Sequence, residues 1–146
     1  MKLFFALIAE REWMLEMSKG EERIAKLLAG ANYSFDREYI IHDVKGKKPL
    51  RYDFAVFDKQ HNLRCLIEFE GRQHYEYTPY FHENRQAFAR YQEHDRVKIN
   101  ACLARSIPLY IIPFTEEENL NFAENLFQEK FLPKSRWHND YNNPLK

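Results

Sequence analysis

Three short apolar runs, separated by turn signals, lie between residues 35 and 70, and they constrain the fold more than any other feature. Residues 35–41 and 52–57 have the alternation typical of strands, and residues 58–62 form the expected turn into a third strand, 63–70. Because the second connection is short, we expect the last two strands to pair antiparallel. The centre of the chain therefore predicts a small β-sheet.

Helical patterns flank these strands. Ser18 is the expected N-cap of a helix that ends near Gly30. A long helix over about 86–105 precedes a short apolar strand, 108–114, and Thr115 caps a last helix over 115–132, before a tail from 133 to 146. This order predicts one α/β domain with a small mixed sheet flanked by helices.

The first seventeen residues have an apolar stripe at helical spacing that continues through the charges of residues 10–12. This pattern favours an amphipathic helix over a secretion signal. No apolar run reaches the ~18–20 residues of a membrane span, and Cys65 and Cys102 are too few for a disulfide framework. We expect a cytoplasmic protein of a bacterial or phage-infected cell, with no membrane partner.

The chain of 146 residues carries 22 basic and 22 acidic side chains, which give a formal net charge of zero. This balance excludes binding of nucleic acid by bulk charge alone. The charges are nevertheless segregated, since four basic residues crowd one short stretch: Lys45, Lys47, Lys48 and Arg51. A local basic surface is therefore compatible with the composition.

Two acids occupy one face of the third strand. Glu68 and Glu70 are two residues apart, and Asp53 on the preceding strand becomes a neighbour of Glu68 when the two strands pair. Like charges side by side destabilise a strand unless a cation lies between them. Hard divalent cations select carboxylate oxygens, so the placement indicates a metal site. The alternative is three solvated acids on an open sheet face.

Two helical acids have a similar ambiguity. Glu21 shares the inward face of its helix with Ile24, so it needs a metal, a basic group or water there, or else it only favours the helix dipole. Asp95 lies on the buried face of the long helix, with Lys98 one turn later. Lys98 therefore either pairs locally with Asp95 or brings a positive charge to the acid cluster.

The segments SKGEERIAKLL, FDREYI, RYDFAVF, LIEFEGRQHY and DRVKINACLARSIPLYIIPF resemble, in this order, the PD-(D/E)XK or restriction-endonuclease-like nucleases. The resemblance covers residues 18–114 and points to a phage and mobile-element branch related to very-short-patch repair and homing endonucleases. It implies a restriction-endonuclease-like core of order α-βββ-α-β, to which the N-terminal and C-terminal helices are additions.

The resemblance also implies roles for particular residues. Asp53 corresponds to the first acid of the motif, with Tyr52 replacing the usual proline, and Glu68 corresponds to the second acid. Glu21 corresponds to the helix acid that completes the metal site, and the peptide carbonyl of Phe69 to a backbone ligand. The implied metal is Mg²⁺, for which Mn²⁺ substitutes.

One position departs from the motif, because Glu70 stands where the lysine belongs. The group that activates the attacking water therefore stays open. Three polar side chains are candidates, with the last two favoured over the first: Gln73, His74 and Lys98.

The activity that the resemblance implies is hydrolysis of DNA phosphodiesters by metal-activated water. Neighbouring phosphates would be held by basic side chains at Arg51, Arg72, Lys45, Lys47 and Lys48. The sequence has no separate recognition motif, so specificity would need a homodimer or a guiding protein. The alternatives are a nickase or branched-DNA nuclease, a binding module that has lost catalysis, and an interaction protein with acidic ends.

Overall fold

The computed structural model describes residues 8, 19–42, 46, 48–79 and 81–133. A helix covers residues 19–30. The strands are β1 (Ser34–Ile41), β2 (Leu50–Phe57), β3 (Leu63–Glu70) and β4 (Leu109–Pro113), and the long helix is α2 (Arg85–Ala104). The predicted N-terminal helix, except for the helical residue Ile8, falls outside this set, as do the Ser18 cap and residues 134–146 of the tail.

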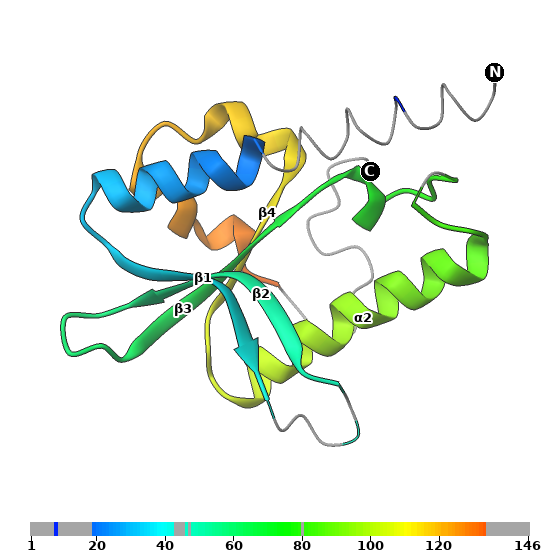
Figure 1. Ribbon diagram of the computed structural model, residues 1–146, viewed down its shortest axis with the longest axis horizontal. Helices are drawn as coiled ribbons and strands as arrows, with labels where there is room; N and C mark the ends of the chain where they lie inside the picture. The colour runs from blue at the N-terminus through cyan, green and yellow to red at the C-terminus, as the bar shows by residue number, and fades with distance from the viewer. Residues whose placement is uncertain (1–7, 9–18, 43–45, 47, 80, 134–146) are drawn as a thin grey trace.

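The four strands form one sheet in the order β1-β2-β3-β4 (Figure 1). The first two pairings are antiparallel, and β3 pairs with β4 in parallel. A parallel pair needs a crossover connection, which α2 provides. The prediction of a small mixed sheet flanked by helices is confirmed.

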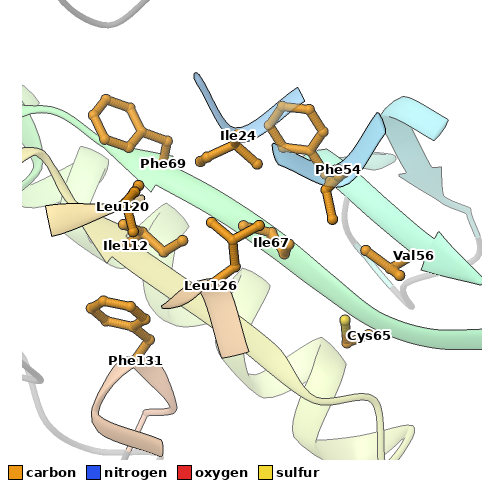
Figure 2. Close-up of a cluster of buried hydrophobic side chains, with 11 residues drawn as sticks. Ile24, Phe54, Val56, Cys65, Ile67, Phe69, Ile112, Leu120, Leu126 and Phe131 are labelled. Atoms are coloured by element: carbon orange, nitrogen blue, oxygen red, sulfur yellow. The ribbon is translucent and has the colours of Figure 1, made fainter. Parts of the chain in front are cut away.

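One face of the sheet packs against the helix of residues 19–30 and the C-terminal segment. Ile24 and Leu28 of that helix meet Phe54 and Ile67 of the sheet in a fully buried cluster (Figure 2). Phe69 closes this cluster next to Gly20, where an added methyl group would lie 2.2 Å from the ring. The helix therefore approaches the sheet so closely at this position that only glycine fits.

The other face packs against α2. Ile99 and Cys102 of the helix contact a second buried cluster that includes Tyr52 and Leu66. Cys65 and Cys102 are both buried and unpaired, as expected. In Figure 1 the two helices lie on opposite sides of the sheet, so that both of its faces are covered.

The first helix ends at Gly30, close to the predicted end, but a different residue caps it. Gly30 is its last helical residue, and Asn32, with φ of 60°, adopts the left-handed conformation that terminates it. The amide of Tyr33 donates to the carbonyl of Leu28 at 3.0 Å, and that of Asn32 donates to Ala29 at 3.1 Å. This pair of bonds is a Schellman motif, in which asparagine substitutes for the usual glycine.

The predicted helix over 115–132 is wrong. The segment forms three 3₁₀ turns instead, at Phe114–Asn119, Ala123–Phe127 and Glu129–Phe131. The side chain of Asn125 accepts hydrogen bonds from the amides of Asn121 (3.1 Å) and Phe122 (2.8 Å), a local arrangement that competes with a continuous helix. The apolar periodicity still identified core residues, because Leu120 and Leu126 are buried.

Candidate functional site

Buried polar side chains gather between the end of β3 and the middle of α2. Glu68 and Glu70 point from β3 toward α2 and are only 6% and 3% exposed. Asp95 of α2, which meets them there, is 7% exposed. The interpretation of these acids as solvated groups on an open sheet face is therefore excluded. The 3₁₀ turn η1 (Arg72–His74) follows β3 and places His74 in the same region.

Lys98 of α2 forms an ion pair with Glu68, in which its Nζ donates to Oε1. Tyr52 holds this lysine in place, since its hydroxyl donates to the Lys98 carbonyl at 2.9 Å and its ring lies 4.9 Å from Nζ. Of the two alternatives for Lys98, the structure supports the one in which the lysine reaches the acid cluster. The local pair with Asp95 is not formed, because Asp95 contacts His74 instead.

Asp53 reaches the same place from β2. Its Oδ2 accepts a hydrogen bond of 2.8 Å from the amide of Phe69, next to Glu68 in the chain. The paired register ends at Phe54 with Ile67, so Asp53 lies one step beyond, beside Glu68. The predicted proximity of Asp53 and Glu68 is confirmed.

A change of phase in β2 frees Asp53 for this contact. Tyr52 and Ala55 face α2, whereas Phe54 and Val56 face the opposite side, so strict alternation breaks at Asp53. Opposite this break, Glu38 of β1 has φ of 57°, a strained conformation for a residue that is not glycine. The run of apolar residues from Phe54 to Phe57 is the sequence signal for this irregularity, although the same run also fits an ordinary strand.

The charges of this group do not balance. Burial raises the pKa of Glu68, the charge of Asp53 raises it further, and Lys98 opposes the rise. Burial also raises the pKa of Asp53, against the hydrogen bond from the Phe69 amide. For Lys98, burial lowers the pKa, but Glu68 outweighs it and the net shift is upward. Two buried carboxyl groups thus share one ammonium group, an arrangement that a further cation would stabilise.

Glu21 is half-buried at the edge of this group. Burial raises its pKa to about 7, and the nearby charge of Asp53 adds to the rise. Its carboxylate lies 3.7 Å from the guanidinium of Arg37, so a basic partner is present. The structure therefore brings Glu21 toward the acid pair, as the sequence predicted, and gives it an arginine as well.

His74 connects the two remaining acids. Its Nδ1 lies 2.9 Å from Asp95 and 3.6 Å from Glu70, and the hydroxyl of Tyr91 lies 3.5 Å from Nε2. Burial lowers the pKa of His74, but Glu70 and Asp95 outweigh it and raise the value to about 9. Burial raises the pKa of Glu70 to about 7, against the charge of His74. The three groups form a buried, ion-paired triad.

This triad also has a geometry that could hold a metal ion. One donor atom from each of Glu70, His74 and Asp95 lies within 4.8 Å of the other two. The Nδ1 atom of His74 lies within reach of both carboxylates, so the same geometry suits a protonated imidazole or a bound cation. Glu70, which stands at the position of the motif lysine, contacts His74.

The remaining sequence candidates take other positions. Gln73 is buried in η1. Arg51 pairs with Glu38 at 2.7 Å, and Arg72 pairs with Glu76 at 3.3 Å. Lys48 is exposed, whereas Lys45 and Lys47 lie outside the described residues. The predicted basic surface is therefore represented by single residues whose charges are partly engaged by neighbouring acids.

Sequence reasoning missed His82, which is 1% exposed behind His74. Its Nδ1 accepts a hydrogen bond from the amide of Thr78 at 3.0 Å, and its ring lies 5.3 Å from that of Tyr91. Tyr91 in turn contacts the ring of His74 at 4.9 Å. The available sequence signal for this support is a histidine inside the aromatic segment 75–82.

Comparison with known proteins gives viral relatives. The chain is 34% identical to the uncharacterized protein 307L of Invertebrate iridescent virus 6 over 88 residues, 60% of this chain and 45% of that protein. It is 40% identical to the uncharacterized protein 094L of Frog virus 3 (isolate Goorha) over 58 residues, 39% of this chain and 37% of that protein. The chain spans less than half the length of these relatives.

The uncharacterized protein 033L of Invertebrate iridescent virus 3 is 33% identical over 49 residues, 34% of this chain and 25% of that protein. No protein family matches the chain, and no solved structure matches it. All three of these relatives are viral proteins. They agree with a viral origin of the chain, which is the general part of the expected phage or mobile-element source. No helix within the described part of the chain is long and apolar enough to cross a membrane.

Proposed function

We propose that this chain is a metal-dependent endonuclease that hydrolyses phosphodiester bonds of DNA on a restriction-endonuclease-like core. The observation that carries the proposal is the ion pair between Lys98 and Glu68, beside the carboxylate of Asp53. Two acids and a lysine at one strand end are the groups that the resemblance assigns to the active site. Here the lysine comes from α2 and not from the strand.

The arrangement of elements supports the same core. A helix, three antiparallel strands, a second helix and a strand parallel to the third follow the order α-βββ-α-β that the resemblance implies. Asp53 and Glu68 lie where the second and third strands separate, so that both carboxyl groups border one space. A shared fold alone does not define an activity, so the argument depends on these side chains.

The donor set suits a hard divalent cation. Asp53 and Glu68 offer carboxylate oxygens, and their two acidic groups face only one ammonium group. Glu21 and the carbonyl of Phe69 would complete the set that holds Mg²⁺, with Mn²⁺ as a substitute. When bound, such an ion would supply a nucleophile by lowering the pKa of a coordinated water.

The other residues have separable roles in this proposal. Lys98 takes the place of the motif lysine, orients Glu68 and offers positive charge to the phosphate that is attacked. His74 is held by Asp95 and Glu70 in its protonated form, so it can donate a proton and not accept one. Glu68 keeps Lys98 protonated as well, so activation of the water would fall to the bound metal ion, and we assign charge stabilisation to Lys98 and a proton-donating role to His74.

Cleavage of supercoiled plasmid DNA in Mg²⁺, in Mn²⁺ and in EDTA tests the proposal. We expect nicked or linear product with either metal and none in EDTA, and at least about a 100-fold slower reaction for Glu68→Gln. Glu76→Gln, an exposed acid paired with Arg72, is the matched control and should keep the wild-type rate. Folded protein that binds DNA without cleaving it in any metal would instead favour the binding module.

A further inference from the structure

A cavity of about 270 Å³ lies beside the candidate site, between the start of β2 and the exposed side of α2. Its lining combines two cationic side chains, Lys48 and Arg90, with the apolar Leu50 and Val97. The acid in the lining, Glu93, forms an ion pair of 3.0 Å with Arg96. Because Arg96 offsets the charge of Glu93, the lining of the cavity combines a net positive charge with apolar side chains.

The two cations are available to a ligand. Neither Lys48 nor Arg90 forms an ion pair within the part of the chain that the structure describes, unlike Arg51 and Arg72. His94 lines the same cavity, and burial together with the charge of Lys98 lowers its pKa, so at neutral pH it offers a hydrogen bond without charge. This set of side chains suits an anionic group that carries an apolar moiety.

The position of the cavity relates it to the candidate site. Leu50 precedes Asp53 by three residues on β2, which corresponds to about 10 Å of extended strand. His94 precedes Lys98 by one turn of α2. A nucleic-acid strand advances about 3.4 Å per nucleotide along a duplex axis and further when it is unstacked, so a strand attacked at Asp53 would reach the cavity within at most about three nucleotides.

We infer that this cavity is a subsite for one unstacked nucleotide of the substrate strand, with its phosphate on Lys48 and Arg90 and its sugar and base against Leu50 and Val97. The inference rests on the proposed nuclease function and gives it a substrate class. In a regular duplex each base is stacked and cannot enter a cavity, whereas a single-stranded, gapped or branched substrate presents unpaired nucleotides.

Binding of a fluorescent single-stranded 12-mer, and of the matching duplex, measured in EDTA, tests the subsite without cleavage. We expect tighter binding of the single strand and at least about a tenfold loss for Lys48→Gln/Arg90→Gln. The slope of log affinity against log salt should fall by about 0.7, since Lys48 and Arg90 share one phosphate and each phosphate contact on a single strand contributes about 0.7. Lys59→Gln, in the turn that follows β2, is the matched control and should change affinity less than about twofold.

Val97→Phe fills the cavity without changing charge, and thermal unfolding verifies that the variant is folded. This variant should bind the single strand less tightly, and its affinity for the duplex should be unchanged. A deoxynucleoside monophosphate should compete better than inorganic phosphate. Three results would overturn the subsite. The first is equal affinity for the single strand and the duplex, and the second is equal competition by inorganic phosphate and the deoxynucleoside monophosphate. The third is an affinity of Lys48→Gln/Arg90→Gln that matches that of Lys59→Gln. These outcomes are independent of cleavage, so the nuclease proposal would stand or fall separately.

Discussion

Lys98 on α2 and Glu68 on β3, thirty residues apart in the chain, form a buried ion pair. The pair joins the crossover helix to the strand that precedes it, at the place where Asp53 arrives from β2. Both partners are withdrawn from water, with side chains 13% and 8% exposed. Such a pair is costly to form without further partners, so it is weak evidence for stability, and the role that we propose for it is chemical.

The energetic coupling of this pair is directly measurable. Lys98→Met alone should destabilise the protein by about 3–5 kcal/mol, because it leaves Glu68 buried beside Asp53 without its cation. Lys98→Met combined with Glu68→Gln should cost less than the sum of the single changes. Urea unfolding of the four proteins in a double-mutant cycle gives the coupling energy, and additive effects would show that the two side chains do not interact.

Gly20 is expected to be intolerant of any side chain. Gly20→Ala places a methyl group 2.2 Å from the ring of Phe69, which is packed in the core, so the unfolding free energy should fall by about 1–3 kcal/mol.

The matched control is Gly30→Ala, where the added methyl group meets nothing within 4 Å. This change should be neutral or stabilising by up to about 1 kcal/mol. Chemical unfolding measures both, and equal stabilities of the two variants would argue against the close approach of the helix to β3.

His74 should make stability depend on pH in the alkaline range. Its pKa is about 9 in the folded protein, against an ordinary value of 6.5, because Glu70 and Asp95 outweigh the effect of burial. A raised pKa contributes stability that is fully present below about pH 6.5 and is lost as the pH rises through 9. The difference in unfolding free energy between wild type and His74→Gln should therefore shrink from pH 6 to pH 10.

The same triad predicts a spectroscopic change. Asp95→Asn removes the carboxylate that lies 2.9 Å from Nδ1, so the pKa of His74 should move down from about 9. An NMR titration of the imidazole resonances follows this directly. Asn100→Asp, an exposed change on the same helix, controls for added or lost charge on α2. A value for His74 that stays at about 9 in Asp95→Asn would contradict the ion-paired triad.

The sheet and α2 were predictable because their signals are local. The strand at 63–70 and the helix near 86–105 match the observed Leu63–Glu70 and Arg85–Ala104, and Asn84 caps α2 by accepting from the Ala87 amide at 2.8 Å. The C-terminal segment was not predictable in the same way. Its apolar spacing suits a helix, but the side chain of Asn125 accepts hydrogen bonds from two preceding backbone amides, which compete with a continuous helix.

The site was predictable only in part, for a physical reason. Alternation along β3 placed Glu68 and Glu70 on one face, and a short turn placed Asp53 beside them. The partner of each charge depends on how α2 packs on the sheet, which no local pattern specifies. Lys98 therefore remained undecided between Asp95 and Glu68 until the packing of α2 was known.

The most direct test of the Asp53–Glu68–Lys98 centre is the rate of plasmid nicking in Mn²⁺ by Lys98→Met, beside wild type and Lys59→Met. The account predicts metal-dependent nicking by wild type and by Lys59→Met, and a rate at least about 100-fold lower for folded Lys98→Met. Wild-type rates for Lys98→Met, or no cleavage by the wild-type protein in any metal, would contradict it.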